Sequence, residues 1–183
     1  SNVTVLYKDY IKNVASCEIY STWPESTIRA NVYAIISFTL NRIYTEWYRG
    51  KGKNYQITNS TAYDHAFNYG RNIYDNISAI VDDIFSTYIR RYGRKQPLLT
   101  QYCDGKNVQC PEWMTQWGSK YLGDQGKTPY EILTHFYGTD IELVTAEEVT
   151  GSPASYPGYD LIVGSTGDEV STIQEQLNRI ARN

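Results

Sequence analysis

One long helical pattern constrains this chain more than any other feature. It follows the pair Trp23-Pro24 and extends over residues 28–47. Its apolar residues recur at steps of three and four, which is the spacing along one face of an α-helix. These residues are Ile28, Val32, Ile35, Ile36, Leu40, Ile43 and Trp47. We therefore predict a helix of about 20 residues that begins at Pro24, with Thr22 as a candidate cap, and that buries one apolar stripe.

A shorter segment before this helix carries the first candidate functional residue. Residues 9–20 have helical spacing, and Glu18 falls near the apolar stripe of that helix rather than opposite it. A tight turn after Glu18 leads into the long helix, which would hold the turn and the carboxylate in place. Glu18 is therefore a candidate acid or base, and the alternative is a solvated glutamate at a helix end.

The remaining elements predict the fold class. Residues 59–74 predict a polar loop, in which Asp64 and His65 are either a second acid/base pair or ordinary loop residues. A turn signal between two expected strands predicts a β-hairpin. We expect an α+β fold with a helical core around the long amphipathic helix and a small antiparallel sheet. The expected strands lie at residues 3–6, 55–58, 87–92, 98–102 and 141–144, and the further helices at 76–85, 113–121 and 129–137.

The composition argues against two classes of partner. The formal net charge of −3 offers no electrostatic attraction for nucleic acid or for an anionic membrane. No apolar run approaches the ~20 residues that a membrane-spanning helix needs. Tyrosine outnumbers phenylalanine 18 to 4. Because tyrosine combines an apolar ring with a hydroxyl group, this bias suits either half-wet contacts such as those with sugars or the edge of a core.

Three cysteines leave the redox chemistry open. Cys103 and Cys110 enclose a short polar loop that contains Gly105. They are candidates for a disulfide in an extracellular protein, and for free thiols or part of a zinc site in an intracellular one. Two cysteines are a weak zinc signal because a structural site takes four ligands, so we assign no metal and expect no cofactor. Cys17 is expected to be a buried, inert thiol.

The composition changes near residue 150. Residues 150–159 are rich in glycine, serine and proline, which is typical of a linker. We predict a domain at residues 1–149, a linker at 150–160 and the opening helix of a truncated module at 161–183. That helix has apolar residues on one side, and a single helix cannot bury its own stripe.

Two blocks of sequence resemble one known family. The first consists of V-A-S-C-E at residues 14–18, W-P-E at 23–25 and I-R-A-N at 28–31. The second consists of M-T-Q-W-G at 114–118, Q-G-K at 125–127, Y-E-I-L at 130–133 and F-Y-G-T at 136–139. They resemble the N-terminal and C-terminal motifs of the stage II sporulation protein D (SpoIID) family, and they lie at the corresponding ends of the expected domain.

This resemblance implies a lytic transglycosylase that acts on the glycan strands of bacterial peptidoglycan. It implies Glu18 as the catalytic acid and Thr115, Gln116, Trp117 and Asn31 as substrate-binding residues. Cleavage of a glycosidic bond needs a proton on the leaving oxygen, and a glutamic acid among apolar neighbours holds its proton more readily than one in water. Ordinary glycosidases use two carboxylates. A lytic transglycosylase needs only one, because the C6 hydroxyl of the sugar attacks the anomeric carbon and closes a 1,6-anhydro ring.

The C-terminal residues carry a second resemblance, because residues 161–178 are similar to the opening of a three-helix peptidoglycan-binding domain. Both resemblances imply an extracellular or wall-bound bacterial protein whose partner is the glycan strand. No export signal is visible in the sequence given. The alternative is a non-catalytic peptidoglycan-binding or structural module of a sporulation, cell-surface or phage-like assembly. An enzyme needs Glu18 in an open groove, whereas a binding module can have it closed off, for example by Arg29.

Overall fold

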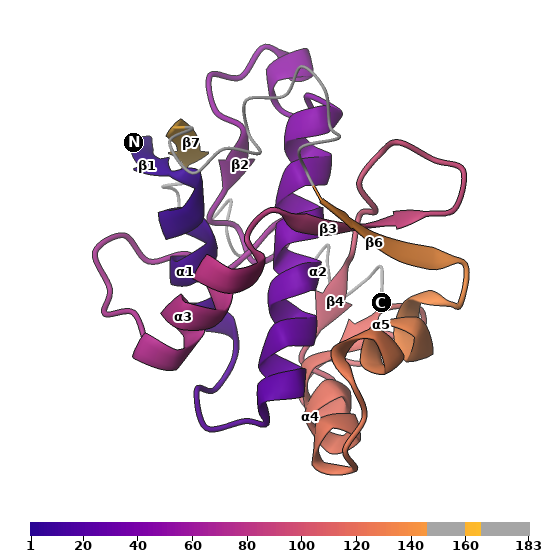
Figure 1. The fold of residues 1–183 in the computed structure, drawn as a ribbon. Helices are drawn as coiled ribbons and strands as arrows, with labels where there is room; N and C mark the ends of the chain where they lie inside the picture. Colours follow the sequence, from indigo (N-terminus) through magenta and orange to yellow (C-terminus); the bar gives the residue numbers. More distant parts are fainter. Residues whose placement is uncertain (146–159, 166–183) are drawn as a thin grey trace.

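The computed structural model describes residues 1–145 and 160–165, and over these ranges the chain forms five α-helices and a set of short strands (Figure 1). The predicted α+β class is confirmed, because the helices form the core and the sheets are small. Within these ranges, no helix combines the length and the apolar character that crossing a membrane requires.

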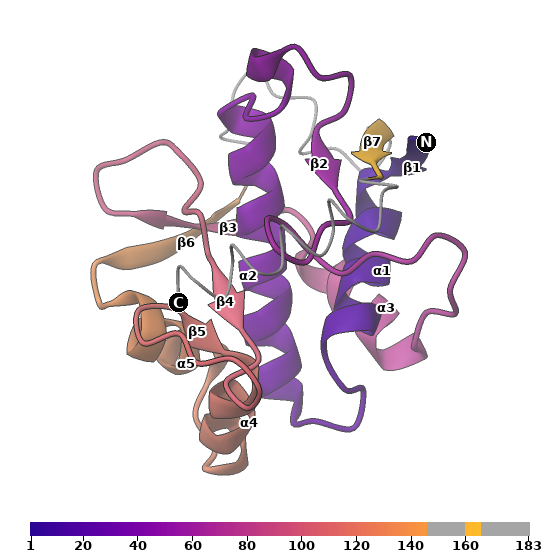
Figure 2. The ribbon, with the colours of Figure 1, turned by 180° about the vertical axis from the view of Figure 1, so that it is seen from behind.

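The central element is α2 (Glu25–Tyr44), which runs through the molecule with other elements on both sides (Figures 1 and 2). Most of the predicted apolar stripe is buried, with Ile43 only partly buried at its C-terminal end, and burial also extends beyond the single stripe that we expected. Small polar residues on other faces of the helix are buried as well, because a helix with neighbours on several sides buries more than one face. These residues are Thr27, Asn31, Ser37, Thr39 and Asn41.

Both ends of α2 differ from the prediction. The helix begins at Glu25, and Pro24 occupies the cap position without a side-chain capping bond, so Thr22 is not the cap. The helix ends at Tyr44, and the chain then turns so that the Trp47 amide donates to the Arg42 carbonyl. Trp47 is 45% exposed and therefore lies at the surface instead of in the buried stripe.

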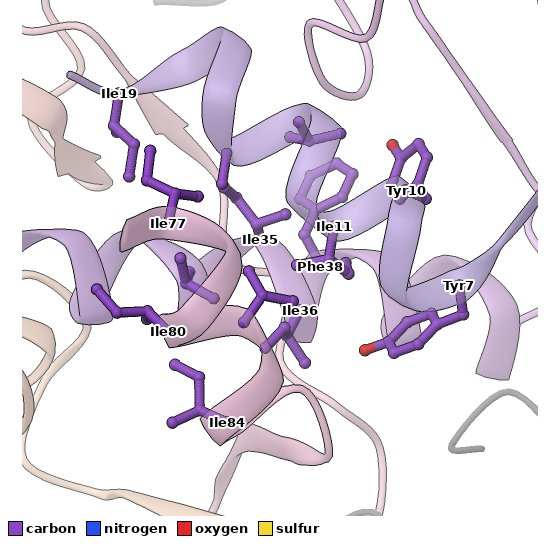
Figure 3. Packing of buried hydrophobic residues seen from close by; sticks show 14 of the residues in the cluster. Tyr7, Tyr10, Ile11, Ile19, Ile35, Ile36, Phe38, Ile77, Ile80 and Ile84 are labelled. Atoms are coloured by element: carbon purple, nitrogen blue, oxygen red, sulfur yellow. The ribbon is translucent and has the colours of Figure 1, made fainter. Parts of the chain in front are cut away.

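On one side of α2 lie α1 (Tyr7–Glu18) and α3 (Asp75–Ile84), whose apolar faces meet that of α2 (Figure 3). Ile11 of α1, Ile35 and Ile36 of α2, and Ile77 and Ile80 of α3 are all buried in this core cluster. The cluster fixes the axis of α1 against α2 and thereby fixes the end of α1, where Glu18 lies.

On the other side of α2 lie α4 (Gln116–Asp124) and α5 (Pro129–Tyr137). A second core cluster joins Ala30 and Ala34 of α2 to Met114, Ile132 and Leu133. The start of α5 confirms its sequence signal. Pro129 occupies the first turn, and a reciprocal capping box links Thr128 with Glu131.

The strands form small sheets of mixed direction, so the small antiparallel sheet that we predicted is only part of the arrangement. In the largest sheet β7 (Asp160–Gly164) lies between β1 (Val3–Leu6), which is antiparallel to it, and β2 (Ile57–Thr58), which is parallel. An antiparallel pair joins β3 (Thr87–Arg91) with β6 (Ile141–Thr145). A parallel pair joins β4 (Tyr102–Cys103) with β5 (Met114–Thr115).

The predicted hairpin of residues 87–92 with 98–102 is wrong. The partner of β3 is β6, and residues 98–101 form no strand, although the Leu98 amide donates to the Ile89 carbonyl. A turn signal reports that the chain reverses direction, but it does not select the partner strand. The pairing of β3 with β6 also brings residue 145 back beside the centre of the fold.

The position of β7 bears on the predicted domain boundaries. Residues 160–164, which we placed at the end of the linker and in the C-terminal module, pair with β1 and β2 and complete the sheet of the N-terminal part. Residues 150–159 of the predicted linker and the helix expected after residue 165 lie outside the described residues.

Candidate functional site

Glu18 is the last residue of α1, and its carboxylate is hydrogen-bonded to a residue that is distant in the sequence. The hydroxyl of Tyr102, in β4, donates a hydrogen bond to Oε2 of Glu18. Glu18 is partly exposed, whereas Tyr102 is buried. The hydrogen bond therefore joins a buried, positioned donor to a carboxylate that still reaches the surface. Arg29, which we considered as a residue that closes off Glu18, instead pairs with Asp83 at 2.6 Å and with Glu25 at 3.6 Å.

Behind Tyr102 lies a strip of buried aromatic and polar groups. The ring of His65 stacks on the ring of Tyr102 with centroids 5.9 Å apart, and Nδ1 of His65 is hydrogen-bonded to the Tyr10 hydroxyl at 2.8 Å. Tyr10 and Glu18 are eight residues apart on α1 and so share one side of that helix. Burial raises the pKa of Tyr10 well above its ordinary value, and the negative charges of Asp64 and Glu18 add to that rise. Tyr10 therefore stays protonated and acts as a neutral hydrogen-bonding group.

An aromatic cluster is formed by the turn that follows Glu18 and by the first turn of α4. It consists of Tyr20, Trp23 and Trp117, whose ring centroids are 5.0 to 5.9 Å apart. Tyr20 is 59% exposed and Trp117 is partly exposed, whereas Trp23 is buried. The ammonium group of Lys106 lies 5.0 Å from the centre of the Trp117 ring. This cluster joins the first sequence block, which contains Trp23, to the second, which contains Trp117.

Thr115 and Gln116, the Thr-Gln pair of the second block, form hydrogen bonds within the first turn of α4. The Thr115 hydroxyl accepts a hydrogen bond from the Gly118 amide at 3.1 Å and caps α4. A Cβ atom at residue 118 would lie 2.2 Å from that hydroxyl oxygen, which explains why the block has glycine there. Gln116 is 7% exposed, and its carbonyl accepts from the Ser119 hydroxyl. Of the second-block residues that we predicted to bind substrate, Trp117 has the most suitable position, beside the turn that follows Glu18.

Asn31 belongs to the contact between α2 and α4. Its side-chain amide donates to the Thr27 carbonyl and to the Ser119 hydroxyl, both at 2.9 Å, and the residue is 3% exposed. The Thr27 hydroxyl in turn donates to the Ser119 carbonyl at 2.8 Å. Asn31 thereby fixes the two sequence blocks relative to each other, and the substrate-binding role that we expected for it stays a prediction.

The loop that follows Tyr102 is closed by a disulfide between Cys103 and Cys110, with an S–S distance of 1.95 Å. Of the three alternatives that the sequence left open, the structure has the disulfide. The Asp104 carboxylate stabilises the same loop by accepting hydrogen bonds from the backbone amides of Lys106, Asn107 and Val108. Burial alone would raise the pKa of Asp104, but these amide bonds outweigh it and hold the pKa below its ordinary value.

Asp64 and His65 do not form an acid/base pair at the surface. The Asp64 side chain is fully buried and pairs with Arg42, whose Nε lies 2.9 Å from Oδ1. Its other oxygen accepts from the Tyr48 hydroxyl and from the Thr58 amide and hydroxyl. The hydrogen bonds of Asp64 therefore link α2, β2 and the loop after α2. Of the two interpretations of the sequence, loop residues fit better than a second acid/base pair. We did not expect these loop residues to be buried.

Two cavities lie along this face of the molecule. A small one of about 70 Å³ is lined by Tyr102 and by Tyr63, Gln101 and Trp113, among others. A larger one of about 430 Å³ lies at the C-terminal end of α2. Tyr63 and Gln101 line both cavities, so the two are adjacent. Tyr102 connects the smaller cavity with Glu18.

Sequence reasoning missed Tyr102, Tyr10 and the aromatic lining of the larger cavity. The excess of tyrosine was the available signal, but composition does not say which tyrosines face a site. Tyr102 was placed in the wrong strand pairing, and its link to Glu18 spans 84 residues of sequence. A contact between residues so far apart in the sequence produces no periodic pattern from which it could be predicted.

No protein-family model, curated protein or solved structure matches this chain. The likeness to the SpoIID family therefore rests on the two sequence blocks and stays a prediction. Among residues 1–145 and 160–165, no group of three or more His, Cys, Asp or Glu side chains is placed to hold a metal ion. The groups gathered here are one carboxylate with a tyrosine hydroxyl, flanked by aromatic rings, and this set suits acid catalysis on, or binding of, a sugar chain.

Proposed function

We propose that this protein cleaves the glycan strands of bacterial peptidoglycan as a lytic transglycosylase, with Glu18 as the general acid. The observation that carries the proposal is the hydrogen bond from the buried Tyr102 hydroxyl to Oε2 of the partly exposed Glu18. A carboxyl group that is oriented by a fixed donor and still reaches solvent meets the geometric requirement for proton transfer to a bound substrate.

The proposed reaction uses Glu18 twice. Its protonated carboxyl group gives a proton to the glycosidic oxygen as the bond from that oxygen to the anomeric carbon breaks. The C6 hydroxyl oxygen of the same sugar then bonds to the anomeric carbon, and the Glu18 carboxylate takes the proton of that hydroxyl. The products are a 1,6-anhydro sugar end and a free hydroxyl on the leaving sugar. No second carboxylate is required, which agrees with the commitment of Asp64 to its ion pair with Arg42.

The surroundings of Glu18 support a sugar substrate. Tyr20 follows Glu18 by two residues and forms a cluster with Trp23 and Trp117. Exposed aromatic rings stack on the apolar faces of pyranose rings, and a tyrosine hydroxyl adds a hydrogen bond at the same place. Tyr20, at 59% exposure, is the ring most available for this contact.

A second candidate function is glycan binding without turnover. It is favoured by the placement of Thr115, Gln116 and Asn31, which cap α4 or fill the contact between α2 and α4 and so have structural roles. In this alternative the aromatic cluster holds the strand and Glu18 only contacts it. The protein would then be a wall-binding or structural module of a larger assembly.

One experiment separates the two functions. Purified peptidoglycan, intact and stripped of its stem peptides, is incubated with the wild-type protein, and both soluble products and protein bound to the insoluble wall are measured. Soluble muropeptides or sugars support the enzyme. Binding to either substrate with no soluble product supports the binding module. If the protein shows no binding and releases no product, both functions are excluded.

A further inference from the structure

The larger cavity, at the C-terminal end of α2, has the features of a ligand site that the reaction at Glu18 does not use. Its volume of about 430 Å³ lies within the range of small-molecule sites. It is formed where α2 ends and the chain turns back through the short helix η1 (Arg49–Lys51) toward β2. Residues from α2, from the following turn, from β2 and from the segment before β4 all contribute to it.

Four of the ten described residues that line the cavity carry aromatic rings. Trp47, Tyr48, Tyr55 and Tyr63 line the cavity. Trp47 is 45% exposed, and the Tyr48 and Tyr55 rings contact each other with centroids 5.2 Å apart. Tyr48 is held in place because its hydroxyl donates to the buried Asp64 carboxylate at 2.6 Å. Fixed rings that border an open volume provide flat apolar surfaces that suit the face of a sugar ring.

The charged groups in this wall are positive. Lys51 and Arg42 line the cavity, and among the described residues that line it none is an aspartate or glutamate. The charge of Arg42 is balanced by Asp64. The ion pairs among the described residues do not include Lys51, whose ammonium group lies 3.4 Å from the centre of the Trp47 ring. Within the described part of the cavity wall, Lys51 is therefore the positive charge that no carboxylate balances, and an anion that binds it is placed beside the Trp47 indole.

The cavity is also connected to the proposed reaction site. Tyr63 and Gln101 line both this cavity and the smaller one, and Tyr102, which follows Gln101 directly, lines the smaller one and binds Glu18.

We propose that this cavity is a subsite for a sugar ring that carries a carboxylate, with the ring on the tyrosine and tryptophan surfaces and the carboxylate on Lys51. The proposal rests on the proposed function, since peptidoglycan alternates neutral N-acetylglucosamine with N-acetylmuramic acid. The carboxylate can be that of the lactyl ether on muramic acid itself or one on its stem peptide. Both present the same group to Lys51.

The test measures binding, and it uses the full chain with Glu18→Gln so that no substrate is consumed. Three probes are compared by calorimetry at low salt: N-acetylglucosamine oligomers, glycan strands stripped of stem peptides, and strands that keep them. The variant Lys51→Gln removes the charge, and Lys53→Gln is the matched control, because Lys53 is exposed in the same turn and does not line the cavity.

The proposal expects stripped or peptide-bearing strands to bind about tenfold more tightly than the neutral oligomers, the size of effect that a single partly desolvated charge contact gives. Lys51→Gln is expected to abolish that preference, and Lys53→Gln to keep it. A preference for peptide-bearing strands alone assigns the carboxylate to the stem peptide. A preference for stripped strands alone assigns it to the lactyl group, whose carboxylate is free only after the amide bond to the stem peptide is broken, and a preference for both means that Lys51 accepts either carboxylate. Equal binding of neutral and carboxylated probes, or equal effects of the two lysine variants, overturns the proposal.

The outcome is independent of cleavage. If the wild-type protein releases no product but the Lys51-dependent preference is present, the subsite stands and the catalytic proposal fails. If the wild-type protein cleaves strands and Lys51→Gln leaves the preference unchanged, the catalytic proposal stands and the subsite fails. Trp47→Ala provides a second check, because loss of the ring should weaken all three probes while its exposed position spares the core.

Discussion

Tyr102, in β4, donates its hydroxyl proton to a hydrogen bond with Glu18, at the end of α1, and so joins two residues that lie 84 positions apart. Three interactions hold Tyr102 in place. Its ring stacks on His65, its strand pairs with β5, and the next residue, Cys103, is held by a disulfide. The orientation of the Glu18 carboxyl group therefore depends on parts of the fold that are distant in sequence.

Tyr102→Phe removes the hydroxyl and keeps the ring. We expect kcat for glycan cleavage to fall by about 100-fold, because an acid that is misplaced by about 1 Å loses that much. KM should change little, since the substitution does not alter the aromatic cluster that we propose to contact the sugar. The free energy of unfolding should fall by no more than about 3 kcal/mol, the upper net value of one hydrogen bond to a charged group. Steady-state kinetics and urea denaturation measure the two effects, and an unchanged kcat would show that Tyr102 does not position Glu18.

Acid should weaken the loop that Asp104 organises. Backbone amides hold the pKa of Asp104 below its ordinary value of 3.8, so its contribution to stability is fully present above that value and is lost as the pH falls through the lowered pKa. We expect wild-type stability to fall more steeply below about pH 4 than that of Asp104→Asn, which lacks the titrating group. Urea denaturation at a series of pH values between 6 and about 2.5 measures the difference. Parallel curves for the two proteins would contradict this assignment.

The disulfide should matter for both stability and activity. A cross-link that closes a loop with a sequence separation of 7 is expected to contribute about 2–3 kcal/mol. We expect the double variant Cys103→Ser, Cys110→Ser to lose about that much, and to lose activity as well, because Cys103 adjoins Tyr102. Cys17→Ser is the control, since Cys17 is the free cysteine and its removal should leave sensitivity to reductant unchanged. If reductant has no effect on the melting temperature of the wild-type protein, the prediction fails.

The buried ion pair between Arg42 and Asp64 should dominate the stability of the region around the larger cavity. Asp64→Asn leaves the Arg42 charge buried without its partner, and we expect a loss of about 3–5 kcal/mol. Asp82→Asn is the matched control, because Asp82 is half-exposed and pairs with Lys8 and Lys12 at the surface, where such a change costs about 1 kcal/mol or less. Chemical denaturation compares the two variants. Similar losses would mean that the Arg42–Asp64 pair is not the special case that its burial indicates.

The sequence predicted the elements of the fold better than their partners. The periodic patterns found α1, α2 and α3, and the Thr-Pro signal found the start of α5, because these signals are local. The pairing of β3 with β6 and the parallel pairing of β4 with β5 were missed, since pairing depends on tertiary contacts. The insertion of β7 between β1 and β2 was missed for the same reason, and because a glycine- and proline-rich stretch precedes it.

The same distinction applies to the site. Glu18 and Trp117 were identified from motifs, and the structure gathers them around the turn after α1. Asn31 and Gln116 were assigned to substrate on the same grounds, and the structure places both side chains in buried positions. A motif records which residue types occur together, and it does not separate those that contact a substrate from those that hold the motif together.

The measurement that tests the central claim most directly is the mass of the products released from peptidoglycan by the wild-type protein, Glu18→Gln and Glu25→Gln. Glu25 is an exposed carboxylate in the first turn of α2 and serves as the matched control. We predict products that end in a 1,6-anhydro sugar, lighter by one water molecule than hydrolysis products, from the wild type and Glu25→Gln and not from Glu18→Gln. Products with reducing ends, or anhydro products from Glu18→Gln at the wild-type rate, would contradict the assignment of Glu18 as the acid of a lytic transglycosylase.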